Sequence, residues 1–359
     1  MNRDEREVIC RVLKIQKRKT VTFIYVSGGG LDQLMVDNLM FDSITINRYD
    51  IIKVRISLLK NHKGNNVYAV RKIEVVGERS RLGTNSFRYS ISNNCNKKRE
   101  CKNRVIEELE EYLKNIGYKK YYEPITTRYR GVSQASPLKV KGQYVTSYLR
   151  LTHEMNLKRE VCCTLKPSFE IGYVARDVYF QQYGSPEYLS LETVAPFFKA
   201  DHILETFIFL MQKSCQIADD LNVDHAPLSD VEVVRYDEIG KKVTDRNIIY
   251  LDAPVSSPFV KCIEGKRTEI RWEYHNQSIG HGYLDENSYD KVYCYFMEQM
   301  EYLLQKGIQA ELSRDFLEVL RIGMPDTVSM GIGLDRFFCV FFQYSSMKDY
   351  FNDLFGVYS

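Results

Sequence analysis

Short runs of alternating or continuous apolar residues, rich in β-branched side chains, dominate the first part of the chain. Turn-forming residues separate them, among them Ser-Gly-Gly-Gly at 27–30 and Asn-His-Lys-Gly at 61–64. This pattern predicts strands at 8–15, 20–26, 33–36, 51–58 and 66–74. Five short strands within about 70 residues are typical of a small closed barrel, and the OB-fold is the commonest barrel of that kind.

A polar stretch without apolar periodicity follows the barrel segment, and it is rich in Ser, Asn, Arg and Lys. We interpret it as a linker, which gives expected domain limits of 1–80 for the barrel, 81–102 for the linker and 103–359 for a second domain. Apolar residues return at helical spacing from 103 to 116, with glutamates on the other face and Gly117 at the helix C-cap position.

The rest of the chain mixes strand-like and helical segments without a regular strand–helix–strand rhythm. Expected strands cover 144–151, 169–178, 188–194, 248–251, 269–274 and 330–342, and expected helices cover 155–163, 200–221 and 289–307. The hairpin-like junction at 275–277 favours an antiparallel sheet flanked by helices. The predicted fold class is therefore α+β, with an OB-fold barrel before an antiparallel-sheet domain.

The composition limits the class of protein but does not identify its function. A length of 359 residues favours two domains. The net charge of +3 is small, so any basic surface for nucleic acid has to be local. Nine cysteines without a CxxC pair are typical of reduced thiols in a cytosolic protein. The chain has neither a signal-like start nor an apolar run of membrane-spanning length, so we expect a soluble, cytoplasmic protein with no membrane partner.

Three separated segments carry a resemblance to a known family. The first is the helix at 103–116 followed by GYKKYYEPI. The second consists of SYLRLTHEMNLKREV (147–161), FEIGYVARDV (169–178) and SPEYLSLE (185–192). The third is GMPDTVSMGIGLDRFF (323–338). In this order they resemble the three motifs of class II aminoacyl-tRNA synthetases, and the lysyl type within the Asp/Asn/Lys subclass in particular. The resemblance implies a class II catalytic domain that uses ATP and Mg²⁺, takes a basic amino acid and tRNA, and forms a homodimer.

The resemblance also implies a nucleotide site. Amino-acid activation is an in-line attack of a carboxylate on the α-phosphorus of ATP, so fixed cations are needed to bring two anions together. Arg176 matches the arginine that bridges the amino-acid carboxylate and the α-phosphate. Arg336 matches the arginine that lies over the adenine. A guanidinium group suits both tasks because it is planar and permanently charged. Tyr188 matches the ring on the other adenine face. The expected nucleotide site is completed by Asp177, Gly331 and Gly333.

An amino-acid pocket follows from the same resemblance. Glu154 matches a glutamate that holds the α-amino group, and Gly131 a backbone position beside it. Glu192 and Asp285 match two carboxylates that face the ε-ammonium of lysine, and Tyr283 fits as an aromatic wall. Two carboxylates are costly to bury unless a cation meets them, which favours a substrate with a basic side chain.

Several positions depart from the lysyl pattern. Glu273 matches one magnesium ligand, but Ser278 stands where a second carboxylate is expected, and a hydroxyl is a poor substitute. His281 replaces an asparagine of the amino-acid pocket. The remaining departures are Ala175, Val178, Tyr183, Gly184 and Val194.

Phe23 and Gln33 of the barrel match positions that stack on and read an anticodon base; the alternative is a barrel-wall Phe and a surface Gln. Three functions therefore stay open. The first is activation of a lysine-like amino acid and its transfer to tRNA. The second is transfer to a protein or small-molecule acceptor, and the third is a pseudo-synthetase that binds tRNA or an amino acid without chemistry.

Overall fold

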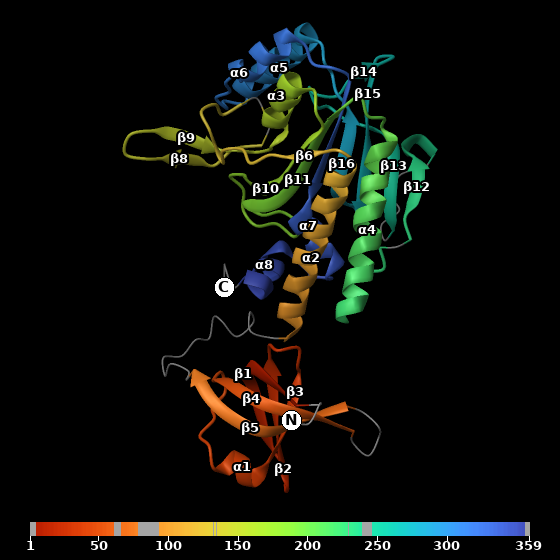
Figure 1. Ribbon diagram of the computed structural model, residues 1–359. Coiled ribbons are helices and arrows are strands. Elements are labelled where there is room, and N and C mark those ends of the chain that lie inside the picture. The colour runs from red at the N-terminus through yellow and green to blue at the C-terminus, as the bar shows by residue number, and fades with distance from the viewer. Residues whose placement is uncertain are drawn as a thin grey trace. The chain divides into compact units, whose positions relative to one another are not determined.

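A computed structural model of the chain describes residues 5–60, 66–77, 93–131, 133, 135–228, 230–238 and 246–355. Five strands in the N-terminal part pair in the order β1-β2-β3-β5-β4 and close into a barrel, because β1 also pairs with β4 (Figure 1). Their bounds are β1 (Glu5–Lys17), β2 (Val21–Ser27), β3 (Gln33–Asp37), β4 (Ile51–Lys60) and β5 (Asn66–Gly77), with α1 (Asn38–Asp42) after β3. The turn expected at 61–64 lies outside the described residues.

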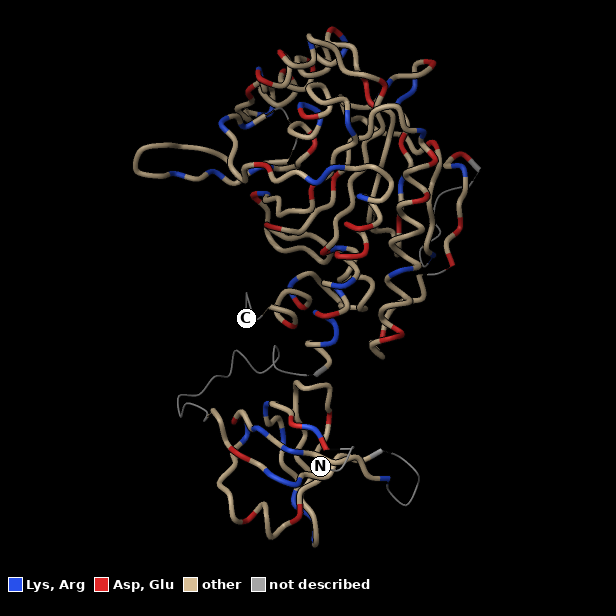
Figure 2. Tube along the Cα trace, viewed as in Figure 1, with Lys and Arg blue, Asp and Glu red and all other residues tan. Residues whose placement is uncertain are grey.

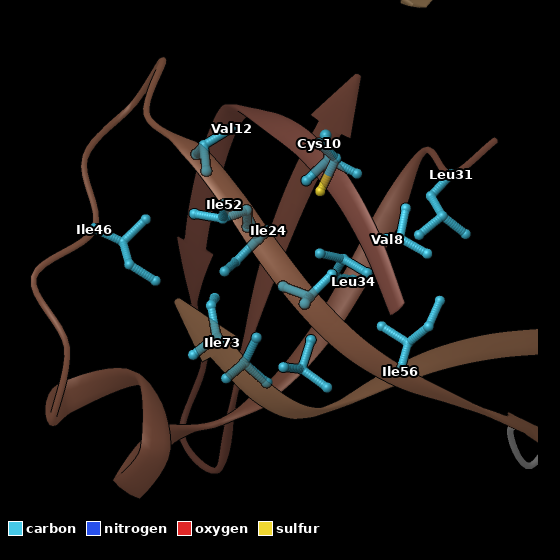
Figure 3. Packing of buried hydrophobic residues seen from close by; sticks show 14 residues of the cluster. Val8, Cys10, Val12, Ile24, Leu31, Leu34, Ile46, Ile52, Ile56 and Ile73 are labelled. Atoms are coloured by element: carbon cyan, nitrogen blue, oxygen red, sulfur yellow. The ribbon is translucent and has the colours of Figure 1, made fainter. Parts of the chain in front are cut away.

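Alternation of the side chains builds the barrel core. Inward-facing residues such as Val8, Cys10 and Val12 of β1 meet Ile24 and Leu34 of β2 and β3, and all are buried (Figure 3). A strand with one buried face needs this period of two, which is why the sequence pattern identified these strands. The OB-fold expectation is confirmed by this strand order.

The second sheet has nine strands, of which eight run in the order β12-β13-β15-β16-β17-β11-β10-β6, and β14 pairs with β15. Most neighbouring strands are antiparallel, as the hairpin signal at 275–277 predicted. The strands are β6 (Lys119–Lys120), β10 (Ser168–Ala175), β11 (Glu187–Pro196), β12 (Glu232–Arg235), β13 (Asn247–Pro254), β14 (Cys262–Ile263), β15 (Lys266–Tyr274), β16 (Gln277–Leu284) and β17 (Thr327–Gly333). A separate small sheet joins β7 (Thr126–Thr127), β9 (Thr146–Leu149) and β8 (Lys139–Lys141).

Helices cover both faces of the large sheet (Figure 1). On one face α2 (Asn93–Asn115) and α4 (Asp201–Leu221) lie side by side, with Tyr112 and Phe209 stacked 4.0 Å apart. On the other face α3 (Glu154–Thr164), α5 (Tyr289–Gln305) and α6 (Arg314–Ile322) share a core cluster with Val194 of β11. The remaining helices are η1 (Tyr236–Glu238), α7 (Leu334–Phe341) and α8 (Met347–Phe355).

Two expected elements were wrong in part. Helix α2 begins at Asn93, inside the expected linker, because Cys95, Cys101 and Lys102 extend its buried stripe although the local sequence is polar. The strand expected at 330–342 ends at Gly333, and α7 follows it. The apolar run there is buried on all sides of a short helix, and periodicity cannot distinguish such a helix from a buried strand.

The described residues fall into two compact units, one within Met1–Glu100 and Phe351–Ser359 and the other within Cys101–Tyr350. Lysines and arginines are interspersed with aspartates and glutamates in both units (Figure 2), in line with the small net charge. None of the helices in the described part of the chain is long and apolar enough to cross a membrane.

Candidate active site

Three neighbouring strands, β11, β17 and β16, place several of the expected site residues on one face of the large sheet. Side chains alternate along a strand and cross-strand partners share a face. Tyr188 and Glu192 lie on this face of β11, and Gly331 of β17 pairs with both Glu192 and His281. Tyr283 follows on β16, its ring nearly parallel to the imidazole of His281. Tyr188 and Glu192 are four positions apart on β11, which corresponds to roughly 13 Å, so the site has two ends.

Glycines keep this region open and let its back be covered. A Cβ at Gly331 would lie 3.4 Å from Cε1 of His281 and 3.8 Å from Cγ of Glu192, so glycine leaves the space between these two side chains free. On the opposite face a Cβ at Gly282 would lie 2.7 Å from Cδ1 of Ile203. Helix α4 therefore packs directly on the back of the sheet.

A cavity of about 720 Å³ opens on the site face, a size typical of sites for small molecules and cofactors. The expected residues that line it are Gly131, Glu154, Arg176, Tyr188, Glu192, His281, Tyr283, Gly331, Gly333 and Arg336. Asp177, Glu273 and Asp285 are not among its lining residues. Most of the expected nucleotide and amino-acid residues, far apart in the sequence, thus meet in one cavity.

Two arginines and one aromatic ring form the first end of the cavity. The guanidinium carbon of Arg176, which follows β10, lies 5.1 Å from the ring centroid of Tyr188. Arg336 donates from Nε to the carbonyl oxygen of Tyr183 (2.8 Å) and from Nη1 to that of Ser278 (2.7 Å). Burial lowers the pKa of Arg336 from its ordinary value, and the two carbonyl oxygens hold its planar group in place.

Two glutamates lie at the other end. Glu154 begins α3 and accepts a hydrogen bond from the hydroxyl of Tyr283 at 2.6 Å. Glu192 accepts from the hydroxyl of Thr152 and, at 2.9 Å, from the main-chain N–H of His153. Burial, followed by the nearby carboxylates, raises the pKa of Tyr283 well above its usual value, so the phenol stays protonated and can donate. This end is suited to bind cationic groups.

This arrangement agrees with the comparison to family models. Residues 78–278, more than half of the chain, match the model described as tRNA synthetases class II (D, K and N). The chain belongs to this family. The resemblance stated from the three motifs is thereby confirmed, as is the α+β fold class.

Curated relatives of this chain are lysine–tRNA ligases at low identity. The chain is 24% identical to the Saccharolobus solfataricus enzyme over 94% of its own length and 85% of the relative's. It is 19% identical to the Mycoplasma mycoides subsp. mycoides enzyme and 22% identical to that of Latilactobacillus sakei, over 72% and 69% of its own length. In those two matches it spans only 64% and 61% of the relatives.

A solved structure has the same fold. Asparaginyl-tRNA synthetase from Pyrococcus horikoshii, complexed with asparaginyl-adenylate, aligns with a TM-score of 0.77, 14% identity and coverage of 97% of this chain and 94% of that one. Identity this low supports the synthetase fold and leaves the substrate open.

The magnesium ligand expected from the family finds little support in the geometry. Glu273 of β15 lies 3.8 Å from Arg271 and pairs across the hairpin with Ser278, whose hydroxyl offers no charge. Burial raises the pKa of Glu273 above its usual value. Within the described ranges no three His, Cys, Asp or Glu side chains cluster as a metal site. The described residues therefore do not provide a cluster of side chains that would hold magnesium by themselves.

The structure places Asp285 below the cavity, 1% exposed, and its carboxylate forms an ion pair with Lys158 at 2.9 Å. Sequence reasoning missed Lys158, which lies one helical turn after Glu154 on α3 and pairs with it at 2.6 Å. The i, i+4 spacing of Glu154 and Lys158 was the available signal. Asp177 is exposed outside the cavity.

Phe23 and Gln33 lie on the outer face of the barrel. Phe23 pairs across the strands with Met35 and Gln33 with Tyr25, so the two expected RNA-binding residues are diagonal neighbours. Phe23 is half-buried and Gln33 exposed. An aromatic and a polar side chain close together on the outside of a barrel are suited to base stacking.

Proposed function

We propose that this synthetase activates lysine, or a close basic analogue, with ATP to give an aminoacyl-adenylate and then transfers the aminoacyl group to tRNA. The observation that carries the proposal is the single cavity in which Arg176, Tyr188 and Arg336 meet Glu154 and Glu192. The roughly 13 Å between Tyr188 and Glu192 leaves room for a ligand with a base at one end and an amino acid at the other.

Each cation has a proposed task in the reaction. The amino-acid carboxylate attacks the α-phosphorus of ATP, an O–P bond forms, and pyrophosphate leaves with the electron pair of the bond that breaks. Arg176 neutralises the two anions as they approach, and the base stacks between Tyr188 and Arg336. The contact of Arg336 with two carbonyl oxygens supports this task, because a group held in place before binding stabilises charge without reorganisation.

The negative end supports a basic amino acid. Glu154 is proposed to bind the α-ammonium group and Glu192 the side-chain cation, with His281 and Tyr283 as walls of the pocket. The known partners of the Glu192 carboxylate are a hydroxyl and a main-chain N–H, so its charge is not neutralised by them. Gly131 lies in the lining beside this end.

The barrel supports tRNA as the acceptor, through Phe23 and Gln33. A homodimer is proposed as well, as the family resemblance implies. Magnesium is proposed to enter with the nucleotide, since such ions are commonly held mostly by phosphate oxygens and water.

Pyrophosphate exchange tests the proposal. The folded protein, with ATP and magnesium, is assayed with lysine, ornithine and arginine in turn. We expect exchange that depends on one of these amino acids. Folded protein that exchanges with none of them would overturn activation of a basic amino acid.

A pseudo-synthetase is the second candidate, and it is favoured by Ser278, an uncharged residue that pairs with Glu273 where the family pattern has a second carboxylate. This candidate predicts that a basic amino acid raises the melting temperature through binding to the folded state while exchange stays absent. Transfer to a protein or small molecule would instead retain exchange but show no charging of any tRNA.

A further inference from the structure

The buried ammonium group of Lys158 forms ion pairs with two carboxylates, one that lines the cavity and one that does not. Lys158 is 1% exposed, and its Nζ lies 2.6 Å from Oε1 of Glu154 and 2.9 Å from Oδ1 of Asp285. The same Nζ lies 4.1 Å from the ring centroid of Phe259. In these surroundings the ammonium group contacts two carboxylates and an aromatic face instead of water, so its position is fixed by strong interactions.

The two carboxylates face different environments. Glu154 lines the cavity, whereas Asp285 is closed off below it and accepts a hydrogen bond from Ser329 at 2.7 Å. Burial works against the ammonium, but Asp285 and Glu154 outweigh it and raise the pKa of Lys158. Burial also raises the pKa of Asp285, and Lys158 offsets this only in part, because Glu154 adds repulsion.

We infer that Lys158 is a positioning residue that holds Glu154 in the cavity wall, and that Asp285 acts on the amino acid only through Lys158. The inference rests on the proposed function. According to this inference, Glu192 contacts the side-chain cation of the substrate directly and Asp285 does not. Lys158 and Asp285 then form a charged layer beneath the floor of the pocket.

The alternative is that Lys158 is a counter-ion required for folding alone. A buried ion pair that loses one partner is strongly destabilised, so loss of activity in a single variant cannot separate the two roles. The variant that separates them is Lys158→Met/Asp285→Asn, which removes one positive and one negative charge together.

The test measures two quantities on the full chain: the melting temperature, and the dissociation constants of L-lysine, L-ornithine, L-arginine and ATP by calorimetry. We expect Lys158→Met to lower the melting temperature and the double variant to recover much of the loss. The single variant and the double variant should each bind the amino acid about tenfold more weakly than the wild type does, because Glu154 has lost its charged partner in both proteins.

Two further variants locate the direct contact. Asp285→Asn should bind the amino acid within about threefold of the wild type, whereas Glu192→Gln should lose about tenfold or more. ATP affinity should stay unchanged throughout. Lys213→Met, which breaks an ion pair with Glu108 outside the cavity, serves as the matched control and should leave both affinities unchanged.

Three results would overturn the inference: additive melting shifts for Lys158 and Asp285, a double variant with wild-type amino-acid affinity, or Asp285→Asn as impaired as Glu192→Gln. Protein that binds a basic amino acid but shows no pyrophosphate exchange refutes the proposed function alone, and the affinities still decide the role of Lys158. Folded wild type that binds no basic amino acid overturns both.

Discussion

Asp335 accepts a hydrogen bond through Oδ2 from the main-chain N–H of Leu189 at 2.7 Å, which joins α7 to β11 beside the nucleotide end of the cavity. Leu189 follows Tyr188, and Asp335 precedes Arg336. One fully buried carboxylate therefore fixes the backbone next to the ring and next to the guanidinium group that are proposed to enclose the base.

Replacement of this carboxylate should affect both stability and nucleotide binding. The other oxygen of Asp335 binds Lys102 at 2.6 Å and Tyr350 at 2.7 Å. Asp335→Asn leaves a buried ammonium without its carboxylate, which costs about 3–5 kcal/mol, and the KM for ATP should rise more than the KM for the amino acid. Tyr350→Phe, the control, removes two hydrogen bonds, one accepted from Lys102 and one donated to Asp335, and should cost about 2–3 kcal/mol with KM unchanged. Equal changes in both KM values for Asp335→Asn would contradict this role.

Filling the gap at Gly331 should block the amino acid. Leucine at this position places side-chain atoms between His281 and Glu192, where even a Cβ would be in contact. We expect Gly331→Leu to bind the amino acid at least about tenfold more weakly, measured by calorimetry. Gly331→Ala, which makes only ordinary contacts, should differ little. Undiminished amino-acid binding by Gly331→Leu would place the substrate elsewhere.

Glu170 should make the folded state sensitive to acid. Burial raises its pKa, but His153, whose Nδ1 lies 3.3 Å from the carboxylate, and the ion pair with Arg150 at 2.7 Å outweigh burial, so the pKa lies below its usual value. A lowered folded-state pKa stabilises the protein fully above the unfolded value of about 4.3, and this stabilisation is lost as the pH falls through the folded value. The melting temperature of the wild type should therefore fall more steeply below about pH 4.5 than that of Glu170→Gln. Parallel curves for the two proteins would rule this out.

The outer face of the barrel should contribute to RNA affinity. Stacking on an aromatic side chain is worth about 1–3 kcal/mol per base, so Phe23→Ala should weaken binding of the cognate tRNA by about five- to 150-fold at fixed salt. Ile9→Ala is a suitable control, because Ile9 is an exposed apolar residue at a different place on the barrel surface, 57% exposed. Filter binding with both variants checks this, and equal affinities would argue against the proposed RNA surface.

Much of the fold follows from local patterns. Strands with one buried face show a period of two, which predicts the barrel strands, and the turn-like residues at 275–277 predict the hairpin there. Segments buried on every side carry no such period, which is why α7 was taken for the end of a strand. The start of α2 was missed because its buried stripe contains Lys102, whose charge is balanced by Asp335 far along the chain.

The same limit applies to the site. The family resemblance implied that Arg176 and Glu192 belong to one site, and both line the cavity. It could not reveal that Asp285 binds Lys158, because an ion pair between distant segments becomes visible only when the sheet and α3 come together. The role of a charged residue can therefore be assigned only when the residues that contact it in the fold are known.

Direct detection of the adenylate is the most decisive measurement. The protein is mixed with ATP labelled at the α-phosphate and with lysine, ornithine or arginine, and the quenched products are separated. We predict an aminoacyl-adenylate in near-stoichiometric amount with one amino acid, and about 10²- to 10³-fold slower formation in Arg176→Ala, as for the loss of one stabilising donor. Labelled ATP that stays intact with all three amino acids, in protein whose melting curve proves it folded, would contradict the proposed activation reaction.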